Sequence, residues 1–317
     1  MDPKTGAILA MAVAPTFNAN RFPTTRADRR RNRAVTDTYE PGSTFKLVTV
    51  AAALQEGTVT PRSSFRLPPK LQVADRVIRE AHTRGTEQMS VRDIVEYSSN
   101  IGTVTIAQQL GEGRLASWIE RFGFGRRTGV DFPGESSGFA LPLEQWSGST
   151  IGTVPIGHGI AVTPVQMARA YAAIANGGVL VQPHLIERID GRPVARRGAK
   201  RIVSRAVSRQ MLLMLRGVVV EGTGTEAAIP GYSVAGKTGT AAKIDPDGRY
   251  SHTRYVASFV GLVPARQPEL VVMVMVDEPR GSIYGGIVAA PAFKQIARFN
   301  LQHLEVPPDA PRSLRDD

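Results

Sequence analysis

Cysteine is absent from this 317-residue chain, which excludes disulfides, thiolate metal sites and a cysteine nucleophile. The sequence also lacks any run of about eighteen or more apolar residues, so we expect no segment of it to span a membrane. Zinc-finger spacing and basic motifs interleaved with aromatic residues are missing too, and we expect no binding to nucleic acid. The formal charge of +11 favours an acidic partner such as an anionic lipid or polymer, but arginine-rich codon usage would produce it equally well.

Three short motifs carry most of the functional information that is present. They are Ser-Thr-Phe-Lys at residues 43–46, Ser-Ser-Asn at residues 98–100 and Lys-Thr-Gly-Thr at residues 237–240. Each is weak by itself, because serine, lysine and glycine are common. Together they supply a nucleophile, a base, a proton relay and a binder for an anionic substrate tail, which is the set that acyl transfer requires.

The first motif follows a Pro-Gly turn and precedes an apolar run, a pattern that predicts the start of a helix. Ser43 would lie at the helix N-terminus, with Lys46 one turn later on the same face. Serine becomes a good nucleophile only when a neighbour takes its proton. Lys46 can do so if burial or a second charge, for which Lys237 is a candidate, lowers its pKa. Taken alone, the pattern more often marks a serine cap and an exposed lysine.

The second motif follows a segment with capping-box spacing, Ser90 to Asp93, which predicts a short helix that ends near Ser98. The Ser98 hydroxyl could pass a proton between Lys46 and a leaving amine, and the Asn100 amide could hold a substrate carbonyl. Taken alone, Ser-Ser-Asn is more often a turn at a helix end.

The third motif lies in an extended stretch whose glycines predict the close approach of another backbone. A substrate peptide that adds to this strand would need the clearance at Gly239. Lys237 and Thr238 offer a positive charge and a hydroxyl to a terminal carboxylate. The backbone N–H groups of Thr240 and Ser43 form the natural oxyanion-hole pair. In isolation, an exposed edge strand explains the motif as well.

The expected fold class is α+β, an antiparallel sheet flanked by helices beside a mostly helical subdomain. The α/β half would comprise residues 1–56 and 231–304 and the helical half residues 57–230, with the site in the cleft between them. Predicted strands cover 7–13, 232–241, 255–263 and 269–277. Predicted helices cover 91–110, 114–122, 164–176, 204–220 and 291–299, whereas 57–89 reads as irregular and 305–317 as a disordered tail. A turn at residues 2–6, directly before the first strand, implies a partner strand upstream, so we expect a fragment or a mis-started reading frame.

Further motifs carry a resemblance that extends over nearly the whole chain. They are Asp-Pro-Lys-Thr-Gly at 2–6, Asn-Arg-Ala-Val-Thr-Asp at 32–37, Tyr-Glu-Pro-Gly-Ser at 39–43, Asp-Pro-Asp-Gly-Arg-Tyr at 245–250, Tyr-Gly-Gly at 284–286 and Ala-Ala-Pro at 289–291. With the three motifs above, whose pattern occurs in penicillin-binding proteins and class A β-lactamases, the chain resembles the transpeptidase domain of class B penicillin-binding proteins, most closely the division-specific, FtsI-like type. One departure is Gly-His-Gly at 157–159, where relatives often carry Gly-Tyr-Gly; we expect a structural role for His158.

The resemblance implies a role for each motif residue. Its site comprises Ser43 as nucleophile, Lys46 as its base, Ser98 and Asn100 from the second motif, and Lys237, Thr238, Gly239 and Thr240 from the third. The implied substrates are peptidoglycan stem peptides ending in D-Ala-D-Ala, which would leave an acyl group on the serine for an amine to resolve. β-Lactams would be trapped there. No cofactor or metal is implied.

The resemblance also implies a place in the cell, on the extracytoplasmic face of the bacterial inner membrane. The implied partners of the full-length protein are a membrane-embedded division glycosyltransferase and other divisome proteins. The family's membrane anchor and N-terminal pedestal module are not recognised in this sequence.

Two other functions use the same motifs. In a β-lactamase or D,D-carboxypeptidase, water attacks the acyl-enzyme, and class A enzymes use a glutamate to activate it. Glu144 is the only glutamate in roughly the corresponding interval, and its context does not resemble theirs. A β-lactam sensor or a binding scaffold is the remaining alternative, for which attached signalling segments would be the discriminating feature.

Overall fold

Three antiparallel strands in the C-terminal third of the chain form the sheet on which the site is built. In the computed structural model, which describes residues 1–196 and 198–310, they are β11 (Ala235–Ile244), β12 (Tyr250–Val263) and β13 (Leu270–Asp277), with β12 in the middle. The predicted antiparallel sheet is therefore confirmed, and the last two predicted strands match β12 and β13 closely.

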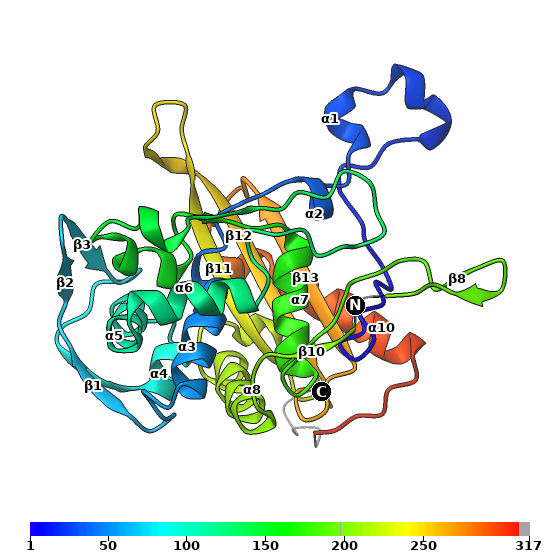
Figure 1. The fold of residues 1–317 in the computed structure, drawn as a ribbon. Helices are drawn as coiled ribbons and strands as arrows, with labels where there is room; N and C mark the ends of the chain where they lie inside the picture. Colours follow the sequence, from blue (N-terminus) through cyan, green and yellow to red (C-terminus); the bar gives the residue numbers. More distant parts are fainter. Residues whose placement is uncertain (197, 311–317) are drawn as a thin grey trace.

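Side chains that alternate along β12 divide the core into two parts. Val260 and Leu262 face a large cluster that includes α3, α5, α7 and α8, whereas Phe259 and Val263 face a smaller one under α10. The Phe259 ring packs on Phe293 of α10, with ring centroids 4.9 Å apart. Helices thus cover both faces of the sheet (Figure 1).

Three long helices provide this cover. α7 (Pro164–Ala175) packs against β13, α8 (Arg205–Val220) against β11, and α10 (Ala290–His303) against β12 and β13. Thr163 caps α7 through a capping box, and Ser204 caps α8 by accepting a hydrogen bond from the Val207 N–H. The sequence predicted both starts.

A second group of helices surrounds α3 (Lys46–Gln55), of which every residue except Gln55 is buried. It comprises α4 (Val91–Glu96), α5 (Asn100–Leu110) and α6 (Glu112–Arg121), and α3 contacts both α5 and α6. The predicted helix over 91–110 is interrupted at residues 97–99, where the second motif lies.

Residues 57–89, which were expected to be irregular, form two antiparallel pairs of strands. β1 (Ser64–Leu67) pairs with β4 (Glu87–Ser90), and β2 (Lys70–Val73) pairs with β3 (Arg76–Arg79). The expectation was wrong because each strand is only four residues long and buries few side chains, so its alternation is weak. β3 contacts α5, which brings this hairpin beside the second motif.

The remaining elements are short. The strands pair as β5 (Phe139–Ala140) with β6 (Ile160–Ala161), β7 (Val179–Leu180) with β10 (Lys200–Arg201), and β8 (Arg188–Ile189) with β9 (Arg192–Pro193). The helices are α1 (Ala27–Arg30), α2 (Arg33–Thr36) and α9 (Gly285–Val288), and the 3-10 turns are η1 (Ala19–Thr24), η2 (Gly42–Phe45), η3 (Leu143–Gln145), η4 (Thr150–Gly152), η5 (Val154–Ile156) and η6 (Thr225–Ala227). In the described ranges, no helix combines the length and the apolar character that crossing a bilayer requires.

The first predicted strand is not formed. The turn at residues 3–5 is present, but only Ala7 makes a bridge, to His184, and the rest of 7–13 has no ladder partner. Met1 instead lies beside β13, where its backbone exchanges hydrogen bonds with Val271. Without a neighbouring strand the apolar pattern of 7–13 has no ladder to join.

Residues 305–310 are also not the disordered segment that was predicted. Val306 packs against the α10 cluster, and the Asp309 carboxylate accepts hydrogen bonds from the Ser233 N–H and hydroxyl. The rest of the predicted tail lies outside the described residues. The division into halves at residues 56 and 230 stays a prediction, and α7 and α8, which it assigns to the helical half, pack on the sheet.

Candidate active site

Ser43 lies in the 3-10 turn η2, and Lys46 is the first residue of α3. The turn is locked against β11 and the 157–159 loop. Gly42 has φ +52, and a Cβ there would lie 2.8 Å from the carbonyl oxygen of Thr240. The Gly42 N–H donates to the Gly157 carbonyl at 3.1 Å. Only glycine allows this approach, which brings the serine beside the third motif.

Lys46 joins the first motif to the second. Its side chain is 2% exposed, and Nζ donates to the Ser98 carbonyl at 2.6 Å, to Ser98 Oγ at 3.2 Å and to Asn100 Oδ1 at 2.7 Å. The Ser43 hydroxyl forms no hydrogen bond with any described residue, so it is free to turn toward Lys46 or a substrate. The structure thus brings Lys46, Ser98 and Asn100 into direct contact, and Ser43 lies in the turn that leads into Lys46.

Ser98 has an unusual backbone conformation, with φ +60. A non-glycine residue in the left-handed region is uncommon and often marks a functional turn. Here the conformation lets both the carbonyl oxygen and the hydroxyl of Ser98 contact Lys46 Nζ.

Burial lowers the pKa of Lys46 to about 7, with a smaller lowering from the positive charge of Arg84 and an opposing effect from the Glu80 carboxylate. A large neutral fraction is then present near pH 7, as a base requires. The pKa of Lys237, which is 1% exposed, is lowered well below its usual value by burial and then by the charge of Lys46. Repulsion between two ammonium groups is mutual, so Lys237 stays the candidate for the second charge near Lys46, and Arg84 adds another positive charge that lowers the pKa of Lys46.

The third motif lies on β11 as predicted, paired with β12 from Lys237–Val260 to Thr240–Ala257. Thr238 Oγ1 lies 2.7 Å from Thr223 Oγ1, and Thr240 Oγ1 accepts a hydrogen bond from the Gly285 N–H at 3.3 Å. These contacts fix the side chains of the strand beside Lys46.

The clearance at Gly239 is filled by this chain itself. A Cβ there would lie 2.4 Å from Ser258 Oγ, 2.9 Å from Thr44 Cγ2 and 3.1 Å from the Pro41 carbonyl oxygen. The backbone that approaches the glycine is thus that of the turn holding Ser43. The addition of a substrate peptide along this strand stays a prediction.

Glu80 was missed by the sequence analysis, as was Arg84. The Glu80 carboxylate, at the end of β3, accepts hydrogen bonds from the Ser99 hydroxyl at 2.5 Å, the Asn100 N–H at 2.7 Å and the Ile101 N–H at 3.3 Å. The neighbouring Arg79 carbonyl accepts from Asn100 Nδ2 at 2.9 Å. No pattern in 57–89 singles out this carboxylate, because its role depends on tertiary contacts.

His158 lies next to the turn but is engaged in structural contacts. Its Nδ1 lies 2.8 Å from Glu40 Oε2, and its ring packs edge-on against Tyr250, with centroids 5.3 Å apart. Glu40 Oε1 also accepts from the Gly159 N–H and the Tyr250 hydroxyl, so Glu40 ties this loop to the β12 end of the hairpin.

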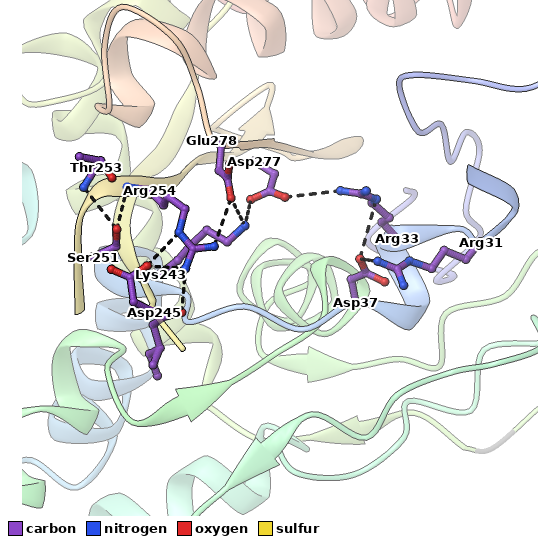
Figure 2. A network of polar contacts seen from close by, with 11 residues as sticks. Arg31, Arg33, Asp37, Lys243, Asp245, Ser251, Thr253, Arg254, Asp277 and Glu278 are labelled. Carbon is purple, nitrogen blue, oxygen red and sulfur yellow. Dashed lines mark hydrogen bonds and ion pairs between the residues drawn. The ribbon is translucent and has the colours of Figure 1, made fainter. Parts of the chain in front are cut away.

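A cavity of about 420 Å³ lies beyond Thr240, between α2 and the ends of β11 and β13. Ion pairs surround it: Lys243 contacts Asp277 and Glu278, and Arg33 contacts Asp277 (Figure 2). These charges compensate one another, which holds α2 against the sheet. Glu144, the candidate water-activating residue, lies in the exposed turn η3, which packs against α6.

Comparison with known proteins defines the class to which this fold and site belong. The family described as penicillin binding protein transpeptidase domain matches residues 1–298, and the chain belongs to this family.

Within this family, the chain is similar in sequence to several individual proteins. The chain is 39% identical to stage V sporulation protein D of Bacillus subtilis over 97% of its length, 38% identical to penicillin-binding protein PbpB of Mycolicibacterium smegmatis over 97%, and 36% identical to peptidoglycan D,D-transpeptidase FtsI of Escherichia coli over 98%. The matches cover 49%, 50% and 52% of those proteins, so the chain spans about half of their length.

Solved structures of penicillin-binding proteins share the fold of this chain. Penicillin binding protein 3 of Mycobacterium tuberculosis complexed with aztreonam matches with a TM-score of 0.92 at 36% identity, covering all of this chain and 74% of that one. The apo transpeptidase domain of penicillin-binding protein 3 from Burkholderia pseudomallei matches with a TM-score of 0.85 at 34% identity, over 98% of this chain and 88% of that one. The resemblance inferred from the motifs and the predicted fold class are both confirmed.

Proposed function

We propose that this chain is a peptidoglycan D,D-transpeptidase domain that cross-links stem peptides through an acyl-enzyme on Ser43, and that β-lactams acylate the same serine. The observation that carries the proposal is the position of Lys46 Nζ, buried between Ser98 and Asn100 and adjacent to the turn that holds Ser43. Family membership supports the reaction class.

In the acylation step, Ser43 Oγ attacks the carbonyl carbon of the penultimate D-alanine while neutral Lys46 takes the hydroxyl proton. The N–H groups of Ser43 and Thr240 stabilise the negative charge on the carbonyl oxygen. The C–N bond then breaks, a proton passes from Lys46 through Ser98 to the leaving amine, and D-alanine departs. An amine of a second stem peptide attacks the resulting ester, and Ser43 recovers its proton.

Lys237 and Thr238 would receive the terminal carboxylate of the donor peptide. A carboxylate beside Lys237 favours its protonated form, so substrate binding opposes the effects that lower its pKa in the free protein. The Asn100 amide, held by Lys46 and the Arg79 carbonyl, would position the peptide backbone.

The names of the relatives and the ligands in their solved structures support a proposal for the cellular role of this protein. Proteins named FtsI and PbpB, and structures of penicillin binding protein 3 complexed with aztreonam and ampicillin, support a septal cell-wall enzyme that β-lactams inhibit. We accordingly propose action on the extracytoplasmic face of the inner membrane, within a longer protein that works with a division glycosyltransferase and divisome proteins.

The experiment is intact-protein mass spectrometry over several hours after addition of benzylpenicillin, with Ser43→Ala alongside. A stable adduct on the unaltered protein that Ser43→Ala abolishes is the expected result. Labelling that persists in Ser43→Ala would overturn the site, provided that circular dichroism finds the variant folded.

The same time course separates the alternatives. An adduct that decays within minutes would mean a β-lactamase or carboxypeptidase, in which water resolves the ester. A stable adduct without cross-linking of a peptide donor to an amine acceptor would favour a sensor.

A further inference from the structure

Within residues 1–196 and 198–310, Glu80 is the one carboxylate that hydrogen-bonds to the turn of the second motif, and it does so from a different part of the chain. It follows β3 of the β2–β3 hairpin, about twenty residues before the motif. Ser99, whose hydroxyl makes the shortest of the hydrogen bonds to Glu80, is fully buried. The three contacts of Glu80 are all to the first residues of α5 or to the N-cap of that helix.

These contacts complete the N-terminus of α5, where the first N–H groups have no intrahelical partner. Glu80 accepts from the N–H groups of Asn100 and Ile101, and Ser99 Oγ accepts from that of Gly102. A negative charge is also favoured at this end by the helix dipole. Asn100 is the first residue of the helix and Ser98 precedes the cap, so a shift of this terminus moves both groups relative to Lys46.

We propose that Glu80 is a positioning residue of the active site, which clamps the backbone at residues 99–101 and thereby holds Ser98 and Asn100 against Lys46 Nζ. This inference rests on the proposed function, in which Lys46 is the base. It goes beyond helix capping, because the same carboxylate also acts on the charge of the base.

The charges that face Lys46 come from two elements. The loop after β3 contributes Glu80, which raises the pKa of Lys46, and Arg84, which lowers it. β11 contributes the buried Lys237, whose own pKa is lowered by Lys46. Removing the Glu80 charge should therefore lower the pKa of Lys46, and removing the Arg84 charge should raise it.

The test compares the pH dependence of benzylpenicillin acylation in Glu80→Gln, Arg84→Gln and the unaltered protein. Because neutral Lys46 is the active form, the midpoint of the rising limb should move to lower pH in Glu80→Gln, by roughly one unit, and to higher pH in Arg84→Gln. The plateau in Glu80→Gln should fall roughly tenfold, since the glutamine nitrogen cannot accept the Asn100 N–H. Asp75→Asn, an exposed carboxylate in the turn of the same hairpin, is the matched control and should move neither quantity.

A purely structural cap predicts another result. Ser99→Ala removes the hydroxyl that accepts from the Gly102 N–H and donates to Glu80, but it leaves the Glu80 charge and its two backbone contacts. It should therefore lower the thermal midpoint without moving the pH midpoint. If Glu80→Gln behaves like Ser99→Ala, with an unmoved or raised pH midpoint, the proposal is wrong.

The titration of Lys46 can also be followed by NMR with ¹⁵N-labelled lysine in the unliganded protein. This measurement separates the two claims. Absence of acylation in the unaltered protein would count against the proposed function, whereas an unchanged Lys46 titration in Glu80→Gln would count against the role of Glu80.

Discussion

The η2 turn, which carries Ser43, packs so closely on β11 that there is no room for a Cβ atom at Gly42 or at Gly239. The turn before α5 is held instead by hydrogen bonds to the carboxylate of Glu80. Both turns adjoin the same lysine: Lys46 directly follows η2, and its Nζ donates to Ser98 and Asn100 of the second turn. Steric packing fixes the η2 turn, so any side-chain volume added there would clash with closely packed backbone atoms. Hydrogen bonds to a charged group hold the second turn, so its geometry should depend on the charges nearby. The nucleophile side should therefore respond to changes in volume, and the second-motif side to changes in charge.

The sharpest test is Lys46→Ala, which removes the proposed base, the residue that both turns adjoin. We expect acylation by benzylpenicillin to slow by roughly a thousandfold or more, because Ser43 loses its proton acceptor. Stopped-flow or quenched mass spectrometry measures the rate. Lys4→Ala, an exposed lysine paired with Glu269, is the control and should react normally. A rate for Lys46→Ala within tenfold of the control would remove Lys46 from this role.

Steric control of the nucleophile side can be broken by Gly42→Ala. Its Cβ would lie 2.8 Å from the Thr240 carbonyl oxygen, in addition to the strain of φ +52. We expect the free energy of unfolding to fall by about 2–4 kcal/mol in urea titrations, the sum of overpacking and left-handed strain.

Gly57→Ala separates the two contributions. Gly57 has φ +68 with no atom within 4 Å of a Cβ, so only the strain of about 1–2 kcal/mol should appear. Equal losses in the two variants would mean that the contact between η2 and β11 adds nothing.

Charge control predicts a pH dependence. The pKa of Lys46 lies near 7 in the folded protein, and only its neutral form accepts a proton, so the acylation rate should rise with pH through that value. Between pH 6 and pH 8 the neutral fraction grows roughly tenfold, and the rate should follow. Circular dichroism over the same range checks that the fold is unchanged. A rate that is flat or falls over this interval would contradict the assignment of Lys46 as the base.

The comparison also explains what the sequence could predict. The strands β11, β12 and β13 and the helix starts after Thr163 and Ser204 are local patterns of apolar spacing and capping, and they were predicted. The three motifs were grouped because their pattern occurs in penicillin-binding proteins and class A β-lactamases, and chemistry explained why such residues suit acyl transfer. Glu80 was not predicted, since nothing local distinguishes a carboxylate at the end of a four-residue strand from an exposed one. The strand expected at 7–13 failed for a related reason: its pattern is local, but a strand exists only where a partner lies beside it.

The smallest expected effect concerns α4, which leads into the second motif. Ser90 and Asp93 form a reciprocal capping box at its start, with Ser90 Oγ accepting from the Asp93 N–H at 3.2 Å. Ser90→Ala should lower stability by about 1 kcal/mol but leave acylation within about twofold, because the hydrogen bonds from Ser99, Asn100 and Ile101 to Glu80 would still hold the turn. Ser204→Ala, which removes the cap of α8 in the same way, is the matched control for unfolding and for acylation. Ser90→Ala could instead slow acylation much more than Ser204→Ala does at equal loss of stability. In that case α4, and not the β2–β3 hairpin, would set the position of the second motif, and charge at Glu80 would not be what holds that side of the site.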